Sequence, residues 1–137
     1  MGYCRVYQET ERRLKMNQIT LKFLRFHCLD RYHCAVGYHQ LIDGVISRFE
    51  KAHPHIKIES MIMRNWYQLM YTLNKKLPTD ESPDVFHTCG GGELEELVEK
   101  DLVHDLSPWL DKGWRESFVA ATFEPLKFDG REYALPL

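Results

Sequence analysis

The sequence lacks a long apolar run. No stretch approaches the roughly 20 apolar residues that a transmembrane helix needs, and the first 16 residues are polar, without the apolar segment of a secretory signal peptide. We therefore expect neither a membrane span nor an export signal in this sequence, with residues 1–16 forming a polar N-terminal extension.

An excess of charge of one sign is also lacking. The 137 residues hold 18 Lys and Arg against 20 Asp and Glu, and the formal net charge is −2. A nucleic-acid-binding domain usually carries a basic excess on one face. We therefore predict no nucleic-acid partner.

Cysteine is sparse. Four irregularly spaced cysteines in a chain of this length do not suggest a small disulfide scaffold. Two of them belong to a polar stretch whose possible metal ligands are His27, Cys28, His33, Cys34 and His39. Five residues separate Cys28 from Cys34, whereas zinc sites usually place two to four between paired cysteines. We predict no metal or cofactor, and keep a metal protein or small enzyme using His27, Cys28, His33 and Cys34 as an alternative hypothesis.

Nucleotide-binding signatures are missing too. The chain has no Gly-Lys-Ser/Thr motif and no G-x-G-x-x-G. It has instead three consecutive glycines, Gly90 to Gly92, between the apolar pair Val85-Phe86 and a helical pattern of Leu94, Leu97 and Val98. These residues predict a short buried strand, a tight turn and a helix.

The start of this predicted helix offers backbone N–H groups to a ligand. Glu93 and the two glutamates that follow lie in the first turn, where they would repel an anion. The pattern favours a neutral, hydroxyl-rich ligand, and a plain turn without a ligand is the alternative interpretation. Cys89 and His87 lie two residues apart with no orienting third residue evident, so we predict no catalytic Cys–His pair.

Strand and helix patterns alternate along the chain. We expect strands at 19–26, 55–63 and 85–86, a loop over 27–38, helices at 39–52, 66–77 and 93–100, a connector with a helical turn at 103–110, a helix at 114–122 and a hairpin at 126–135. Asn65 is the expected N-cap of the second helix. This order predicts an α/β fold with a mostly parallel sheet and helices on both faces.

Four segments, in this order, resemble family 1 extracellular solute-binding proteins, the sugar receptors of bacterial ABC importers that are similar to maltose-binding protein. The first is 41–58, with its Phe-Glu-Lys and His-Pro-x-Ile pattern. The others are the Pro-Asp-Val strand at 83–86, the leucine-rich helix and Asp-Leu-Ser-Pro of 92–108, and the Phe-Asp-Gly-Arg-Glu-Tyr-Ala-Leu-Pro hairpin of 128–136. The resemblance covers about residues 18–137.

This resemblance implies a periplasmic-binding-protein type II-like lobe over 17–137, with the second lobe absent. It implies a chain without catalytic activity that binds an oligosaccharide and docks on ABC permease subunits, outside the cytoplasm and associated with the membrane. Because no signal peptide is evident, a cytoplasmic location is the alternative. The matching alternative function is a ligand-sensing domain of a cytosolic transcriptional regulator.

The resemblance also implies which loops contact the ligand, namely those after the strands of the lobe. The implied contacts are Arg25 and His27 after the first strand, Arg64, Asn65 and Trp66 after the second, and Cys89, Gly90, Gly91, Gly92 and Glu93 after the third. For Trp66, stacking on a sugar face and ordinary packing are both open. A single lobe also leaves one sheet edge exposed, which favours self-association.

Overall fold

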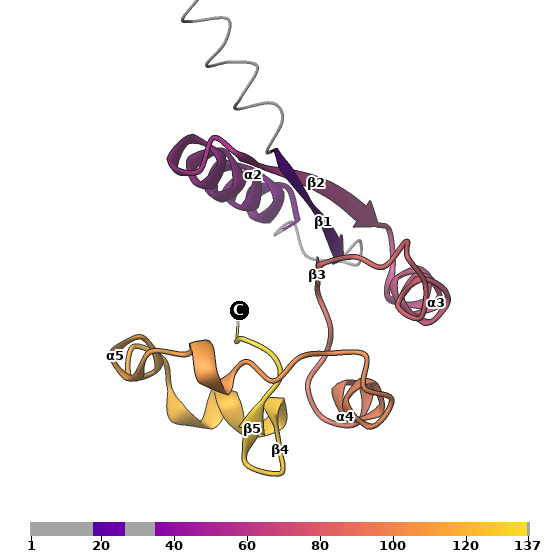
Figure 1. Cartoon of the computed structure of the whole chain (residues 1–137), viewed down its shortest axis with the longest axis vertical. Coiled ribbons are helices and arrows are strands. Elements are labelled where there is room, and N and C mark those ends of the chain that lie inside the picture. Colours follow the sequence, from indigo (N-terminus) through magenta and orange to yellow (C-terminus); the bar gives the residue numbers. More distant parts are fainter. Residues whose placement is uncertain (1–17, 27–34, 137) are drawn as a thin grey trace, which may run out of the picture. The chain divides into compact units, whose positions relative to one another are not determined.

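The computed structural model describes residues 18–26 and 35–136 (Figure 1). The chain divides into two compact units, Met1–His87 and Thr88–Leu137, and each is described by itself. The stretch that holds His27, Cys28, His33 and Cys34 lies outside the described residues.

The first unit is built on a parallel sheet of β1 (Ile19–Phe26), β2 (Ile56–Met63) and β3 (Val85–Phe86), in the order β2-β1-β3. β1 pairs with β2 along its whole length, from Ile19 opposite Ile56 to Phe26 opposite Met63. β3 pairs only with the end of β1, where Phe23 lies opposite Val85. The three strands and the parallel sheet expected from the sequence are confirmed.

Two helices connect these strands, α2 (Ala35–Ala52) and α3 (Trp66–Lys76). Since β2 and β3 lie on opposite sides of β1, right-handed connections place α2 on one face of the sheet and α3 on the other. Figure 1 shows this arrangement. α2 begins earlier than predicted, so the expected loop is wrong over 35–38. Tyr38, in the additional turn, approaches His87 at the end of β3, a tertiary contact that no helical period reveals.

The start of α3 is confirmed. The Asn65 side chain accepts a hydrogen bond from Gln68 N at 2.8 Å, and this satisfies one of the donors that a helix start leaves unpaired. Leu69 and Leu73 of α3 are fully buried. Together with Leu24, Met63 and Leu77 they form the apolar core of the first unit.

β3 differs from the buried strand expected of it, because Val85 is 51% exposed. Hydrogen bonds hold its flanks to β1. Asp84 N donates to Lys22 O at 2.9 Å, and His87 N donates to Leu24 O at 3.0 Å. Position in the sheet, and not burial of Val85, therefore defines this strand.

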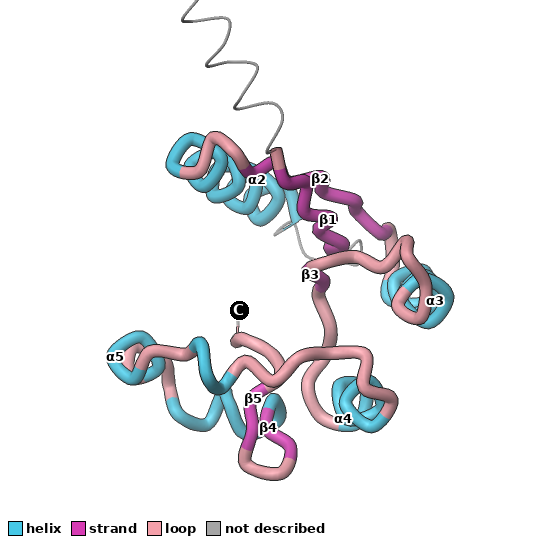
Figure 2. The backbone as a smooth tube through the Cα atoms, in the orientation of Figure 1, coloured by secondary structure: helices cyan, strands magenta, loops and turns pink. Residues whose placement is uncertain are grey.

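The second unit contains α4 (Gly92–Glu99), η1 (Ser107–Trp109), α5 (Lys112–Arg115), η2 (Ala120–Leu126), β4 (Lys127–Phe128) and β5 (Arg131–Glu132) (Figure 2). Its core is formed by Leu94, Leu97, Phe123 and Leu126. The helical turn expected in 103–110 is confirmed as η1. The hairpin is also confirmed, and Asp129 (φ 50) and Gly130 (φ 76) take the left-handed conformations of a type I′ turn.

The single helix expected over 114–122 is wrong. α5 ends at Arg115, and the 3-10 helix η2 begins only at Ala120. Ser117 Oγ donates to Trp114 O at 2.6 Å, an alternative to the helical hydrogen-bond pattern of the kind that short polar side chains offer. The apolar residues on either side of this break are regularly spaced because Trp114, Phe118 and Phe123 pack against one another, and not because they lie on one helix.

Candidate functional site: the carboxyl edge of the sheet

Arg25 is the penultimate residue of β1 and is 3% exposed. Its Nη2 donates to Asp43 Oδ1 at 2.5 Å, which joins β1 to α2. Its Nε and Nη1 are buried, and no described residue forms a hydrogen bond with them. The structure thus shows a buried cation held by a carboxylate, and its role as a ligand contact stays a prediction.

The structure brings the end of β1 and the start of α3 together. The Phe26 and Trp66 rings meet edge to face, with centroids 5.8 Å apart and planes at 87°. Arg64 and Asn65 are exposed beside them. Arg64 N donates to Gln68 Oε1 at 3.1 Å, so the turn is stabilised by hydrogen bonds to both the backbone and the side chain of Gln68. Three of the predicted residues therefore form one short segment next to β1. His27 lies outside the described residues.

His87 belongs to this edge although the predicted set omits it. Its Nδ1 accepts a hydrogen bond from Phe26 N at 3.3 Å, and its Nε2 lies 3.5 Å from the Tyr38 hydroxyl. The Phe23 and His87 rings meet edge to face, with centroids 5.3 Å apart. The position of His87, directly after the third strand, could have marked it in the sequence as a residue of this edge. Its contact with Tyr38, 49 residues away, could not be predicted from the sequence.

Both polar groups of this pair are kept uncharged. Burial lowers the pKa of His87, and electrostatic interactions with Arg25 and His39 lower it further. Burial raises the pKa of Tyr38, against a smaller opposite effect of Arg25. Because Nδ1 accepts from the Phe26 amide, the proton of the neutral imidazole sits on Nε2 and points to the Tyr38 oxygen.

The glycine turn lies in the second unit, where packing explains Gly90 and backbone conformation explains Gly91. A Cβ on Gly90 would lie 2.9 Å from Pro125 O and 3.0 Å from Leu126 Cδ2. Gly91 has φ +72 and donates from its N to Pro125 O at 2.7 Å. Nothing lies within 4 Å of a Cβ on Gly92, the first residue of α4. A Cβ on Gly91 would likewise meet nothing within 4 Å, so Gly92 differs from Gly91 in having no left-handed φ.

Cys89 and Glu93 flank the turn and interact with each other. Cys89 is exposed. Its partial burial raises the pKa of the thiol, and the negative charge of Glu93 and a hydrogen bond to it raise it further. A protonated thiol is a poor nucleophile. The pair is therefore suited to hydrogen bonding and not to thiolate chemistry.

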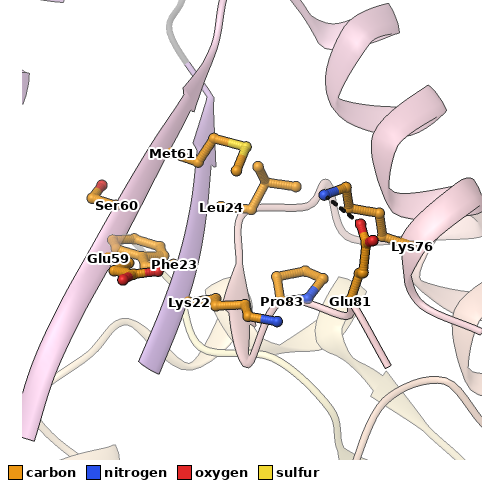
Figure 3. Close-up of a pocket in the computed structure, with 9 residues that line it drawn as sticks. All are labelled: Lys22, Phe23, Leu24, Glu59, Ser60, Met61, Lys76, Glu81 and Pro83. Atoms are coloured by element: carbon orange, nitrogen blue, oxygen red, sulfur yellow. Dashed lines mark ion pairs between the residues drawn. The ribbon is translucent and has the colours of Figure 1, made fainter. Parts of the chain in front are cut away.

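A separate hollow of about 440 Å³ lies on the flank of the first unit (Figure 3). Leu24 and Met61 of the sheet lie opposite Lys76, the last residue of α3, and Glu81, which form an ion pair at 3.2 Å. The other lining residues are Lys22, Phe23, Glu59, Ser60 and Pro83. None of the predicted ligand residues that the structure describes lines this hollow.

In residues 18–26 and 35–136, no three His, Cys, Asp or Glu side chains gather as metal ligands would. No helix within these ranges has the length and apolarity to cross a membrane.

This combination of a three-stranded parallel sheet, two covering helices and a following helical unit with a hairpin is found in the solute-binding proteins of sugar ABC transporters. A chitin oligosaccharide binding protein matches with a TM-score of 0.74 and 18% identity over 88% of this chain and 29% of its own. A structure from work on xylan utilization by the bacterium Caldanaerobius polysaccharolyticus matches with a TM-score of 0.70 and 22% identity, over 84% and 28% of the two chains.

A family 1 extracellular solute-binding protein from Alicyclobacillus acidocaldarius matches with a TM-score of 0.65 and 18% identity, over 85% of this chain and 27% of its own. The chain thus spans under a third of the length of these structures. No protein-family model and no curated protein matches it. The similarity establishes the fold expected from the four ordered segments.

Proposed function

We propose that this chain is part of a carbohydrate-binding receptor of an ABC importer. The observation that carries the proposal is the fold shared with solute-binding proteins, among them a chitin oligosaccharide binding protein and a protein with mannotriose bound. The carboxyl edge of the sheet supports it, because ligands of open α/β folds bind beyond the carboxyl ends of the strands.

In this proposal, the ligand contacts of the first unit are Arg25, His27, Arg64, Asn65 and Trp66. Trp66 supplies an aromatic surface for a sugar ring, and its neighbours supply hydrogen-bonding groups. Within the second unit, taken by itself, the proposed contacts are Cys89, Gly90, Gly91, Gly92 and Glu93. The open surroundings of Gly92 and the neutral thiol of Cys89 are compatible with close approach of an uncharged ligand.

The partners and location follow from the same proposal. The structural neighbours are sugar-binding proteins of ABC transporter systems and not enzymes. We propose docking on ABC permease subunits, a location outside the cytoplasm and no catalytic role. No feature of the described residues favours the alternative of a sensing domain in a cytosolic regulator.

Calorimetric titration of the chain with xylo-, manno- and chito-oligosaccharides tests the proposal. We expect one class to bind, and Trp66→Ala to weaken its binding about tenfold or more, since about 1.4 kcal/mol of lost stacking corresponds to that factor. The matched control is Trp109→Ala, because Trp109 is 83% exposed on η1 and lies outside the predicted set. No heat with any sugar at millimolar concentration, or equal losses in both variants, would contradict the proposal.

A further inference from the structure

Three elements of the first unit converge on the imidazole of His87. The residue directly follows β3, and its backbone N donates to Leu24 O of β1 at 3.0 Å. Its Nδ1 accepts from Phe26 N of β1 at 3.3 Å, and its Nε2 lies 3.5 Å from the Tyr38 hydroxyl of α2. One side chain thus links the end of β3, the end of β1 and the first turns of α2.

We propose that His87 is a proton-sensitive clasp, which in its neutral form holds the ends of β1 and β3 against α2 and which acid opens. The inference starts from these contacts and does not depend on the proposed ligand. It assigns a conformational role to a residue outside the predicted site.

The geometry requires the neutral form because Nδ1 is a hydrogen-bond acceptor. A proton on Nδ1 would place two donors, imidazolium N–H and Phe26 N–H, against each other. The hydrogen bond would be lost and a backbone N–H left without its partner, which is costly inside a protein. The Phe23 ring against the imidazole offers no compensating anion.

Electrostatic interactions with neighbouring groups also disfavour the protonated form of His87. In the described part of the chain, Arg25 of β1 and His39 of α2 interact electrostatically with His87, and both interactions lower its pKa. Tyr38, the other titratable group facing it, is kept neutral by burial. The carboxylate of Asp43 is engaged by Arg25 at 2.5 Å. Directly before β3, Asp84 Oδ2 accepts from Lys22 N at 2.7 Å.

The sign of the pH effect follows from the lowered pKa of His87 in the folded state. The unfolded chain takes up a proton near the ordinary value of 6.5, before the folded chain does. The contribution of the clasp is therefore complete above that pH and is lost as the pH falls below it. For one proton, the folding equilibrium constant falls by at most about tenfold per pH unit.

The first measurement is the titration of the histidine ring nitrogens by NMR in the unmodified chain. We expect the His87 ring to show the Nε2–H tautomer at neutral pH and to remain neutral at pH values where free histidine is protonated. Titration of His87 at or above pH 6.5, or an Nδ1–H tautomer, would overturn the proposal. This measurement needs neither a sugar nor a variant, so its failure is distinct from a failure of the proposed function.

The second measurement is the urea midpoint of three proteins between pH 7.5 and pH 5. In His87→Asn the amide oxygen takes the place of Nδ1 as acceptor and cannot be protonated in this range. We expect its midpoint to fall less toward pH 5 than that of the unmodified chain. His104→Asn, which changes an exposed histidine of the second unit, is the matched control and should fall as the unmodified chain does. Equal pH slopes in both variants would overturn the clasp, and if His87→Asn does not fold, the ring titration decides.

Discussion

Glu132 shows how a single buried charge organises the second unit. The side chain is 2% exposed, and one carboxylate oxygen accepts a short hydrogen bond from Arg115 Nη2. Its backbone is held as well, because Glu132 N donates to Ser107 Oγ at 2.9 Å and Leu106 N donates to Glu132 O at 2.7 Å. Lys127 Nζ, 4.0 Å from Oε1, is the second cation near it. The residue thus joins η1, α5 and the hairpin.

At this scale we predict that Arg115→Ala lowers the free energy of unfolding by about 1–3 kcal/mol, because it removes the closest partner of a buried carboxylate. Urea denaturation at pH 7 measures the loss. The matched control is Lys112→Ala in the same short helix. Lys112 is 90% exposed and lies 3.9 Å from Glu116, so its removal should change stability by no more than about 0.5 kcal/mol. Similar effects of the two substitutions would contradict the role given to Glu132.

At the residue scale, three of the predicted site residues already make contacts within the protein. Arg25 and Asn65 already serve the fold, one through Asp43 and the other as the N-cap of α3. Trp66 packs on Phe26 from a half-buried position. Their side-chain chemistry suits a sugar, but the contacts shown are contacts within the protein. For this reason Trp66→Ala needs both a binding and a stability measurement.

At the scale of the element, the turn before α4 needs glycine for two different reasons, close packing and a left-handed backbone conformation, which the sequence does not distinguish. Gly90 is needed because Pro125 and Leu126 pack against it, and Gly91 because its φ is +72. Gly92 opens the helix with free space around it. The three consecutive glycines therefore occupy three different environments.

We predict that Gly90→Ala destabilises the protein by about 1–3 kcal/mol, because the added methyl group meets backbone and side-chain atoms at about 3 Å. Gly92→Ala should leave stability within about 0.5 kcal/mol of the unmodified chain or raise it, since alanine favours a helix. Thermal unfolding measures both. If the turn also contacts a sugar, only Gly92→Ala weakens binding in a stable protein. A stable Gly90→Ala variant would show that the packing at Pro125 is looser than described.

At the scale of the whole molecule, the three-stranded sheet of the first unit has two edges, β2 and β3. Apolar side chains are exposed on both, with Val85 at 51%, Met61 at 49% and Ile62 at 43%. Exposed edges with apolar side chains favour pairing with another strand. The structure thus gives a physical basis for the predicted self-association, which stays a prediction.

We expect the chain to elute earlier in size-exclusion chromatography as its concentration rises. Val85→Lys places a charge on the β3 edge and should shift the elution toward the monomer. Val119→Lys is the matched control, because Val119 is 72% exposed but lies outside the sheet. A concentration-independent monomer of the unmodified chain would contradict the prediction.

The sequence by itself determined the order of strands and helices, the Asn65 cap, the Asp129-Gly130 turn and the resemblance to solute-binding proteins. These features depend on neighbours within a few residues, so their patterns are visible in the chain. Where the sequence misled, as over 114–122, a local hydrogen bond of Ser117 interrupted a helix that the apolar period alone supports.

Only the tertiary structure decided which polar groups meet. Arg25 pairs with Asp43 at a separation of 18 residues, Arg115 with Glu132 at 17, and Tyr38 approaches His87 at 49. It also decided that Gly90 is small because Pro125 lies against it. Such contacts leave no periodic pattern or fixed spacing in the sequence, because they arise when separate helices and strands pack together. The composition of the candidate site was thus predictable in part, whereas the charge state of His87 and the burial of Arg25 followed from packing alone.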